Sequence, residues 1–203
     1  MSLETLKPKV AELIEKAQNS GGEEFVGIKF LDIHSGYSQP SKVDLRSIPQ
    51  PSANLSFFGY YMFANASANA NGGLYTVLQE IFLPDWLVSF SNYMFRYCVN
   101  LENIYGDFSS VTSVGNESLS NCKKLLNIPY MPNLQTIGSS SFSNCTGLTE
   151  VIFPATITSI NSNSFNGCTN VTDVYCPWAE GTIANAPWGM TNATIHYNHN
   201  AEV

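Results

Sequence analysis

Four of the five cysteines stand at nearly equal steps along the chain, and this spacing constrains the fold more than any other feature. Cys98, Cys122, Cys145 and Cys168 follow one another at intervals of 24, 23 and 23 residues. A disulfide framework or a metal site depends on distances in space, and neither needs equal steps along the chain. A solenoid built from one repeated unit does need them. We therefore predict a repeat in which each cysteine is a free thiol in the same inward slot, with disulfides or a metal site as the alternatives.

Aligning the units on these cysteines also brings the large apolar residues into columns. Each unit is L-x-x-I, then two aliphatic positions three apart, then F-x-x-C, and about four full copies are present. The first two columns are Leu78, Leu101, Leu125, Leu148, Val171 and Ile81, Ile104, Ile128, Val151, Val174. The next three are Leu87, Val111, Leu134, Ile157; Phe90, Val114, Ile137, Ile160; and Phe95, Leu119, Phe142, Phe165. Since one unit cannot bury its apolar side alone, the units must stack and share a core.

The strand pattern also predicts which side chains point outward. Alternate residues of a strand point to opposite sides, so the third and fifth positions of L-x-x-I-x-F face outward. The third positions are Glu80, Asn103, Asn127, Glu150 and Asp173, and the fifth are Phe82, Tyr105, Pro129, Ile152 and Tyr175. Aromatic rings stack on sugars or anchor protein contacts, and amides and carboxylates bind hydroxyl groups. All of these except Pro129 are our candidate partner-binding residues, although strand propensity alone also favours aromatic and β-branched residues there.

Two segments carry a resemblance to a known repeat family. LTEVIFPATITSINSNSFNGC (148–168) and LQEIFLPDWLVSFSNYMFRYC (78–98) resemble the Treponema-type, BspA-like leucine-rich repeats, and the resemblance extends over residues 78–176. The central units depart from the pattern, because Asp107 stands where Pro84 and Pro154 stand in the better copies, and Met131 precedes a displaced Pro132. These departures affect the strand ends.

This resemblance implies an α/β leucine-rich-repeat solenoid. Its features would be a right-handed coil, short parallel strands on one face, and short helical or irregular turns on the other. The resemblance also implies surface-exposed or virion-associated interaction proteins, and it supplies no catalytic residues.

The two ends of the chain depart from the repeat and are expected to close it. Residues 3–17 have a helical apolar period and predict an N-terminal capping helix. We expect a cap and edge segment over 1–42, repeats over 43–176 and a C-terminal cap over 177–203, with a degenerate first copy at Leu55, Phe58, Phe63 and Ala66. The stretch from Cys176 resembles the end of such arrays in gut bacteria and their prophages, and the first helix is similar to helices of prophage structural proteins. Trp86, Trp178 and Trp188 are expected to pack in caps and turns.

Charge and hydropathy exclude two classes of partner. The net charge is −7 with only nine Lys and Arg residues, whereas phosphate binding needs clusters of them, so we predict no nucleic-acid binding. No apolar run approaches the roughly 20 residues of a membrane span, which predicts no membrane insertion. The opening MSLETLKPKVAELIEK alternates charges where an export signal needs an apolar region. The chain could still reach a cell surface within a larger assembly, or after removal of a leader sequence. The sequence therefore does not assign a localisation.

The residues that could carry chemistry are few, and they do not form a recognisable set. His34, His196 and His199 are the only histidines, and only Cys176 and Glu202 could join the last two at a metal, so we expect neither metal nor cofactor. The chain has no phosphate loop or G-x-S-x-G elbow, and no clamp around a carboxylate pair. We predict a non-catalytic interaction module that binds a protein or glycan through its sheet face. The alternative is a structural or host-contact component of a phage or prophage particle, and an enzyme ranks third.

Overall fold

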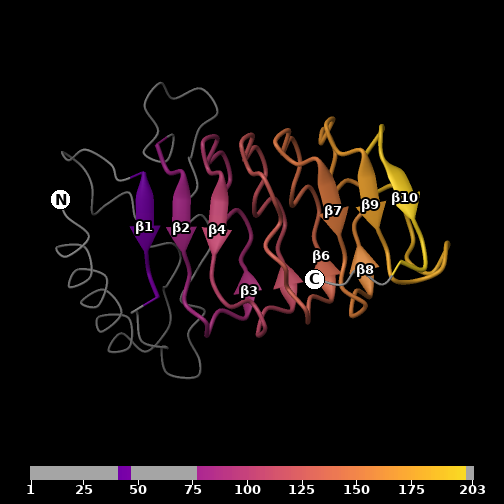
Figure 1. Ribbon diagram of the computed structural model, residues 1–203, viewed down its shortest axis with the longest axis horizontal. Coiled ribbons are helices and arrows are strands. Elements are labelled where there is room, and N and C mark those ends of the chain that lie inside the picture. Colours follow the sequence, from indigo (N-terminus) through magenta and orange to yellow (C-terminus); the bar gives the residue numbers. More distant parts are fainter. Residues whose placement is uncertain (1–40, 47–76, 200–203) are drawn as a thin grey trace.

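The chain winds into a flattened solenoid of short parallel strands (Figure 1). The computed structural model describes residues 41–46 and 77–199. Within these ranges no helix forms, and irregular turns connect the strands. The capping helix predicted over residues 3–17 and the degenerate copy around Phe58 lie outside the described residues.

One face of the solenoid carries the strands predicted from the L-x-x-I pattern, and we call it the front face. Its six strands are β1 (Lys42–Asp44), β2 (Glu80–Phe82), β4 (Asn103–Tyr105), β7 (Glu150–Ile152), β9 (Asp173–Tyr175) and β10 (Thr194–His196). They form two three-stranded parallel sheets, in the orders β1-β2-β4 and β10-β9-β7. In the first sheet, Val43, Ile81 and Ile104 lie side by side, as the inward fourth position requires. The strand alternation inferred from the sequence is therefore present in both sheets.

The front row is interrupted at the third unit, where we expected a strand presenting Asn127 and Pro129. That expectation is wrong, because residues 125–130 form no strand. Pro129 occupies the fifth position, and a proline has no N–H to donate to the preceding coil. The coil nevertheless stays in the stack, since Leu125 is buried and the Leu126 N–H donates to the Glu102 carbonyl at 3.2 Å. The result is a gap in sheet pairing between β4 and β7.

The opposite face, which we call the back face, carries a second parallel sheet among its turns. Its strands are β3 (Ser89–Phe90), β5 (Ser113–Val114), β6 (Thr136–Ile137) and β8 (Ser159–Ile160), paired in that order. The register places Phe90 beside Val114, Val114 beside Ile137, and Ile137 beside Ile160. The back sheet is therefore continuous across the third unit, where the front row is broken.

The core lies between these two faces and consists of the predicted columns. Every member of those columns is at most 8% exposed, except Ile128, which is partly buried. Phe142 and Phe165 are fully buried and stack with ring centroids 5.0 Å apart. The column continues into the C-terminal segment, where the Phe165 N–H donates to the carbonyl of the fully buried Trp188 at 2.9 Å. The segment expected to be only a cap thus adds a further coil, which ends in β10.

The cysteines form a column of free, buried thiols, as their spacing predicted. The Sγ atoms of Cys122, Cys145 and Cys168 each donate to a carbonyl of the preceding coil, at 3.2, 3.1 and 2.9 Å. Burial raises the pKa of Cys98 and Cys145 well above the ordinary thiol value. Cys98 and Cys145 therefore stay protonated at neutral pH, whereas a hydrogen bond with the Cys145 thiol lowers the pKa of Cys168. The hydrogen bonds of Cys122, Cys145 and Cys168 to the preceding carbonyls join neighbouring coils.

We expect Cys98, Cys122, Cys145 and Cys168 to resist alkylation in the native protein. Alkylation needs a thiolate that the reagent can reach. All four side chains are at most 1% exposed, which keeps the reagent away from them, and burial also raises the pKa of Cys98, Cys122 and Cys145. Mass spectrometry after a timed iodoacetamide pulse should show full labelling of all four only in denaturant. Rapid native labelling of all four, or a mass deficit that reveals disulfides, would contradict the thiol column.

Candidate functional site

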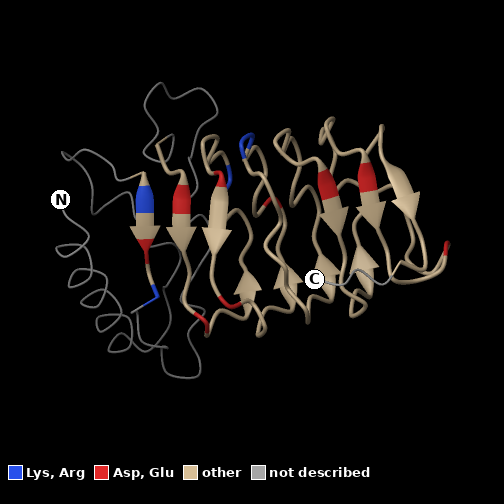
Figure 2. Ribbon diagram, viewed as in Figure 1, with Lys and Arg blue, Asp and Glu red and all other residues tan. Residues whose placement is uncertain are grey.

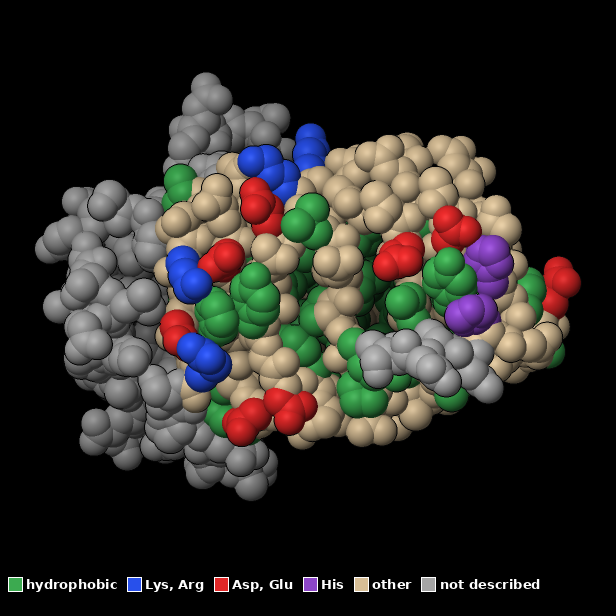
Figure 3. All heavy atoms as spheres, viewed as in Figure 1, with side chains coloured by type: hydrophobic (Ala, Val, Ile, Leu, Met, Phe, Trp, Pro, Cys, Tyr) green, Lys and Arg blue, Asp and Glu red, His purple; other side chains and the backbone are tan. Residues whose placement is uncertain are grey.

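The predicted partner-binding residues lie on the outer surface of the front face. Eight of the nine are on strands, at the outward positions of β2, β4, β7 and β9: Glu80, Phe82, Asn103, Tyr105, Glu150, Ile152, Asp173 and Tyr175. Tyr105 and Glu150 are exposed, and the other six are half-buried. Asn127 is also exposed, but it lies on the coil without a strand. Apolar side chains emerge on this face among the charged ones (Figure 3).

The aromatic residues of the N-terminal half form a closed stack. Phe82 and Tyr105 stack with centroids 4.6 Å apart and an interplanar angle of 24°. From the β1 side, the Lys42 ammonium lies 4.7 Å and the Arg46 guanidinium 4.6 Å from the centroid of the Phe82 ring. Since β2 lies between β1 and β4, the cations and Tyr105 approach the Phe82 ring from opposite sides. Lys42 also forms an ion pair with Glu80, at 2.8 Å.

A second cluster in the C-terminal half contains two of the histidines. Tyr175 stacks on His196 with centroids 4.8 Å apart, and the His199 ring lies 4.7 Å away at a tilt. His196 Nε2 lies 2.8 Å from Asp173 Oδ1, and the Thr172 hydroxyl donates to Asp173 Oδ2 at 2.7 Å. These two contacts hold the pKa of the Asp173 carboxyl below its ordinary value.

The role of this histidine pair could not be read from the sequence. The pairing of β10 with β9 places His196 directly beside Tyr175. His196 therefore extends the column of fifth-position side chains by one coil. In residues 41–46 and 77–199, no group of three or more His, Cys, Asp or Glu side chains could hold a metal ion.

Three exposed large apolar side chains lie on the two coils at the break in the front row. Of the five large apolar residues exposed in the described part of the chain, three are Tyr105 at 40%, Leu126 at 49% and Tyr130 at 43%. Tyr105 ends β4, and the other two flank Asn127 to Pro129 in the coil without a strand. We call these three residues the central patch. Sequence reasoning missed Leu126 and Tyr130, although the proline at the fifth position of that unit was a visible sign of irregular geometry.

Charge is distributed unevenly along the front face. Lys and Arg occur only up to Lys124 in the sequence, so the last coils contain none (Figure 2). The cations of the first coils are paired with acids, as in the contact of Arg46 with Asp44 at 2.7 Å. On β7 and β9 the charged side chains are Glu150 and Asp173, of which Asp173 contacts His196. The front face therefore changes from paired charges to acidic ones along the solenoid.

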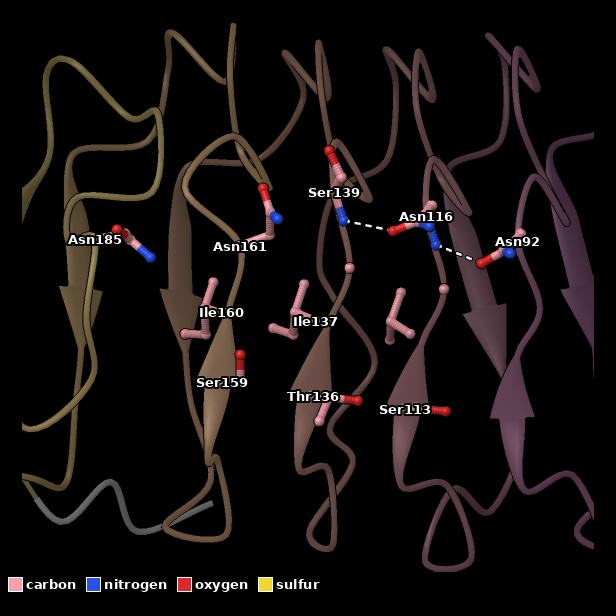
Figure 4. A pocket seen from close by; sticks show the side chains of 13 residues that line it. Asn92, Ser113, Asn116, Thr136, Ile137, Ser139, Ser159, Ile160, Asn161 and Asn185 are labelled. Atoms are coloured by element: carbon pink, nitrogen blue, oxygen red, sulfur yellow. Dashed lines mark hydrogen bonds between the residues drawn. The ribbon is translucent and has the colours of Figure 1, made fainter.

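The back face contains a shallow groove that sequence reasoning did not find. It has a volume of about 430 Å³ and crosses strands β5, β6 and β8 of the back sheet, with Asn92, which follows β3, at one end (Figure 4). The lining residues are all uncharged: Asn92, Ser113, Val114, Gly115, Asn116, Thr136, Ile137, Gly138, Ser139, Ser159, Ile160, Asn161 and Asn185. The recurrence of Ser or Thr directly before the buried residue of each back strand was the available signal.

No helix in the described ranges is both long and apolar enough to cross a membrane. No curated protein matches the sequence.

Solved structures with a similar fold include three bacterial leucine-rich repeat proteins. The protein from Bacteroides ovatus is 21% identical with a TM-score of 0.61, and the match covers 77% of this chain and 36% of that one. The Treponema pallidum protein is 18% identical with a TM-score of 0.54, covering 78% and 69%. A leucine-rich cell surface protein from Faecalibacterium prausnitzii is 19% identical with a TM-score of 0.50, covering 81% and 45%. The chain thus spans about a third of the length of the Bacteroides protein.

The family comparison agrees with the repeat found through the cysteines. The model of the BspA-type leucine-rich repeat region matches residues 74–183 in six copies, more than the four full copies visible from the cysteine spacing. This match covers more than half of the chain. The chain therefore belongs to the BspA-type leucine-rich repeat family.

Proposed function

We propose that this chain is a non-catalytic interaction module that binds a protein partner through its front face. The observation that carries the proposal is the central patch, in which Tyr105, Leu126 and Tyr130 are at least 40% exposed beside a break in the sheet. Contact residues of protein interfaces are enriched in aromatic side chains near the centre, with polar groups at the rim. The charged pairs of Lys42 with Glu80 and of Arg46 with Asp44 fit such a polar rim.

The geometry favours a protein partner over a glycan on this face. A sugar ring that binds an aromatic residue lies against the flat face of the ring. The Phe82 ring is covered by Tyr105 on one side and by cations on the other, and Tyr175 is covered by His196. Phe82 therefore offers only its edge, and one face of Tyr105 and of Tyr175 is already occupied, which suits apolar and edge-to-face contacts with protein side chains better than stacking on a sugar.

The family likeness supports the same class of function. The Faecalibacterium prausnitzii protein is described as a leucine-rich cell surface protein, and we propose a surface role for this chain as well. The alternative of a phage or prophage particle component rests on the predicted helix over residues 3–17, which lies outside the described residues. No described side chains favour an enzymatic role.

Replacing Phe82, Tyr105 and Tyr175 together with Ser is expected to weaken partner binding by about 2 kcal/mol or more while the fold survives. The three side chains are exposed or half-buried and lie outside the core columns. A panel of purified host extracellular proteins, screened by biolayer interferometry, would identify a partner and then compare its affinity for the variant. A second variant, Leu126→Ser with Tyr130→Ser, tests the central patch directly.

Two control variants define the outcome. Val88→Ser removes an apolar side chain that is 59% exposed away from the front strands, and Glu180→Ala changes an exposed charge in the C-terminal segment. Both should bind as wild type does. If both front-face variants bind the partner as tightly as wild type with unchanged thermal stability, the front face is not the interaction surface.

A further inference from the structure

We propose that the groove on the back face is a second binding site, separate from the front face, and that it takes a neutral glycan chain lying along the solenoid axis. The groove combines a rigid floor formed by the strands of the back sheet, three asparagine amide groups and a row of free hydroxyl groups. Its lining residues carry no charge, so no charged side chain is present to favour a charged ligand over a neutral one. The proposal concerns a different surface from the proposed function, so each can fail without the other.

The floor of the groove is rigid because it belongs to the core. Val114, Ile137 and Ile160 are at most 3% exposed and lie side by side in the back sheet. Gly115 follows Val114 and Gly138 follows Ile137, and neither glycine has a side chain that would fill the groove. A ligand in the groove would therefore meet a preformed surface, which lowers the entropy cost of binding.

The amide row is fixed by hydrogen bonds between neighbouring coils. The Asn116 N–H donates to Asn92 Oδ1 at 2.6 Å, and the Ser139 N–H donates to Asn116 Oδ1 at 2.8 Å (Figure 4). Asn161 Oδ1 instead accepts within its own coil, from the Asn163 N–H at 3.2 Å. Because each amide oxygen is occupied, the Nδ2 groups of these three asparagines are left as oriented donors. Each of these donors comes from a different coil.

The hydroxyl row runs beside the amides. Ser113, Thr136 and Ser159 are paired in register in the back sheet, so their side chains recur once per coil. Ser113 is half-buried and the other two are exposed, and none of the three hydroxyls hydrogen-bonds to another described residue. A hydroxyl group both donates and accepts. Each coil therefore offers one free hydroxyl along the groove, next to a row of amide donors.

This pattern fits a glycan better than a peptide. Neighbouring strands are separated by about 4.8 Å, which is comparable to the length of one sugar ring in an extended chain. Sugar hydroxyl and ring oxygens can accept from the Nδ2 groups and exchange hydrogen bonds with the hydroxyl row. An extended peptide would instead pair its backbone with the edge of a sheet, whereas this groove lies over the middle of one. Asn185 closes the C-terminal end of the groove, which therefore spans about four coils.

The test uses neutral oligosaccharides of defined length as probes. Hexasaccharides of cellulose, xylan, β-mannan, amylose and chitin, together with their disaccharides, would be titrated into the full chain by isothermal titration calorimetry. We expect at least one hexasaccharide to bind, and to bind about tenfold or more tightly than its disaccharide, because it contacts several coils at once. Absence of binding by all five hexasaccharides overturns the proposal, as does equal binding of the disaccharide.

Variants then locate the bound sugar. Replacing Ser113 with Ala, Thr136 with Val and Ser159 with Ala removes only the hydroxyl row and should weaken binding about tenfold or more. The matched control Thr149→Val removes an exposed hydroxyl outside the groove and should change nothing. The front-face triple variant should bind the sugar as wild type does. If the groove variant binds normally with an unchanged melting temperature, or if the front-face variant loses the sugar, the site lies elsewhere.

Discussion

Replacing Phe142 with Ala should lower the free energy of unfolding by about 3 to 5 kcal/mol. The ring is fully buried and stacks on Phe165 at 5.0 Å, with an interplanar angle of 8°. The residues above and below it in the column belong to the neighbouring coils, and they are held in place by their own backbones. The cavity left when the ring is removed therefore stays largely unfilled. Urea unfolding followed by circular dichroism measures the loss, and Phe165→Ala should behave similarly.

The matched control for this prediction is another phenylalanine of the same chain. Phe82→Ala removes a half-buried ring from the front face and should cost about 1 kcal/mol or less, as surface changes usually do. A loss below about 1 kcal/mol for Phe142→Ala as well would show that the repeat alignment does not describe the core.

Replacing Gly115 with Ala should cost about 3 kcal/mol, although the change adds only one methyl group. A Cβ at this position would come within 2.6 Å of the Asn92 nitrogen and 2.9 Å of the Ser91 carbonyl carbon. These are backbone atoms, so relief requires the two coils to move apart. Such a shift would also disturb the hydrogen bond from the Asn116 N–H to Asn92 Oδ1. Thermal and urea melts of the full chain measure this cost.

Asn161→Ala is the control for this second prediction. Asn161 follows Ile160 as Gly115 follows Val114, but the coil before it carries Ser139 where the earlier coils carry asparagines. A residue with a Cβ already fits there, so the variant loses only the hydrogen bond between Asn161 Oδ1 and the Asn163 N–H and should cost about 1 kcal/mol or less. Equal losses of stability for Gly115→Ala and Asn161→Ala would mean that the asparagine of the preceding coil, Asn92 in the case of Gly115, is not the reason why glycine is required.

The repeat and its core were predictable because they depend on a local pattern that recurs along the chain. A buried column needs one apolar residue per coil. Aligning the units on the cysteines was enough to align the residues of all the remaining columns. The outward positions of β2, β4, β7 and β9 followed from strand alternation alone. The repeat alignment therefore predicted the core and located most of the candidate contact residues.

The remaining features depend on contacts between coils, which the pattern of one unit does not contain. Side-chain alternation alone does not predict the loss of the strand at Pro129, because the loss depends on the missing N–H donor of proline and not on the direction of its side chain. The stack of Phe82 on Tyr105, and the approach of His196 to Asp173, require the distance between neighbouring strands as well as their register. The back groove depends on the four coils together and on Asn185 from the C-terminal segment.

The break between β4 and β7 has a mechanical consequence. The back sheet runs through β3, β5, β6 and β8 without interruption, whereas the front row is divided into two sheets at the third unit. In a repeat protein each coil contacts only its neighbours. A bending load is therefore passed from junction to junction, and the junction with the fewest contacts bends most. The solenoid should therefore be softest at this coil and should bend by opening on the front side. A partner that binds to Tyr105, Leu126 and Tyr130 would contact the solenoid at the coil that bends most easily. Its binding would therefore change the curvature of the solenoid.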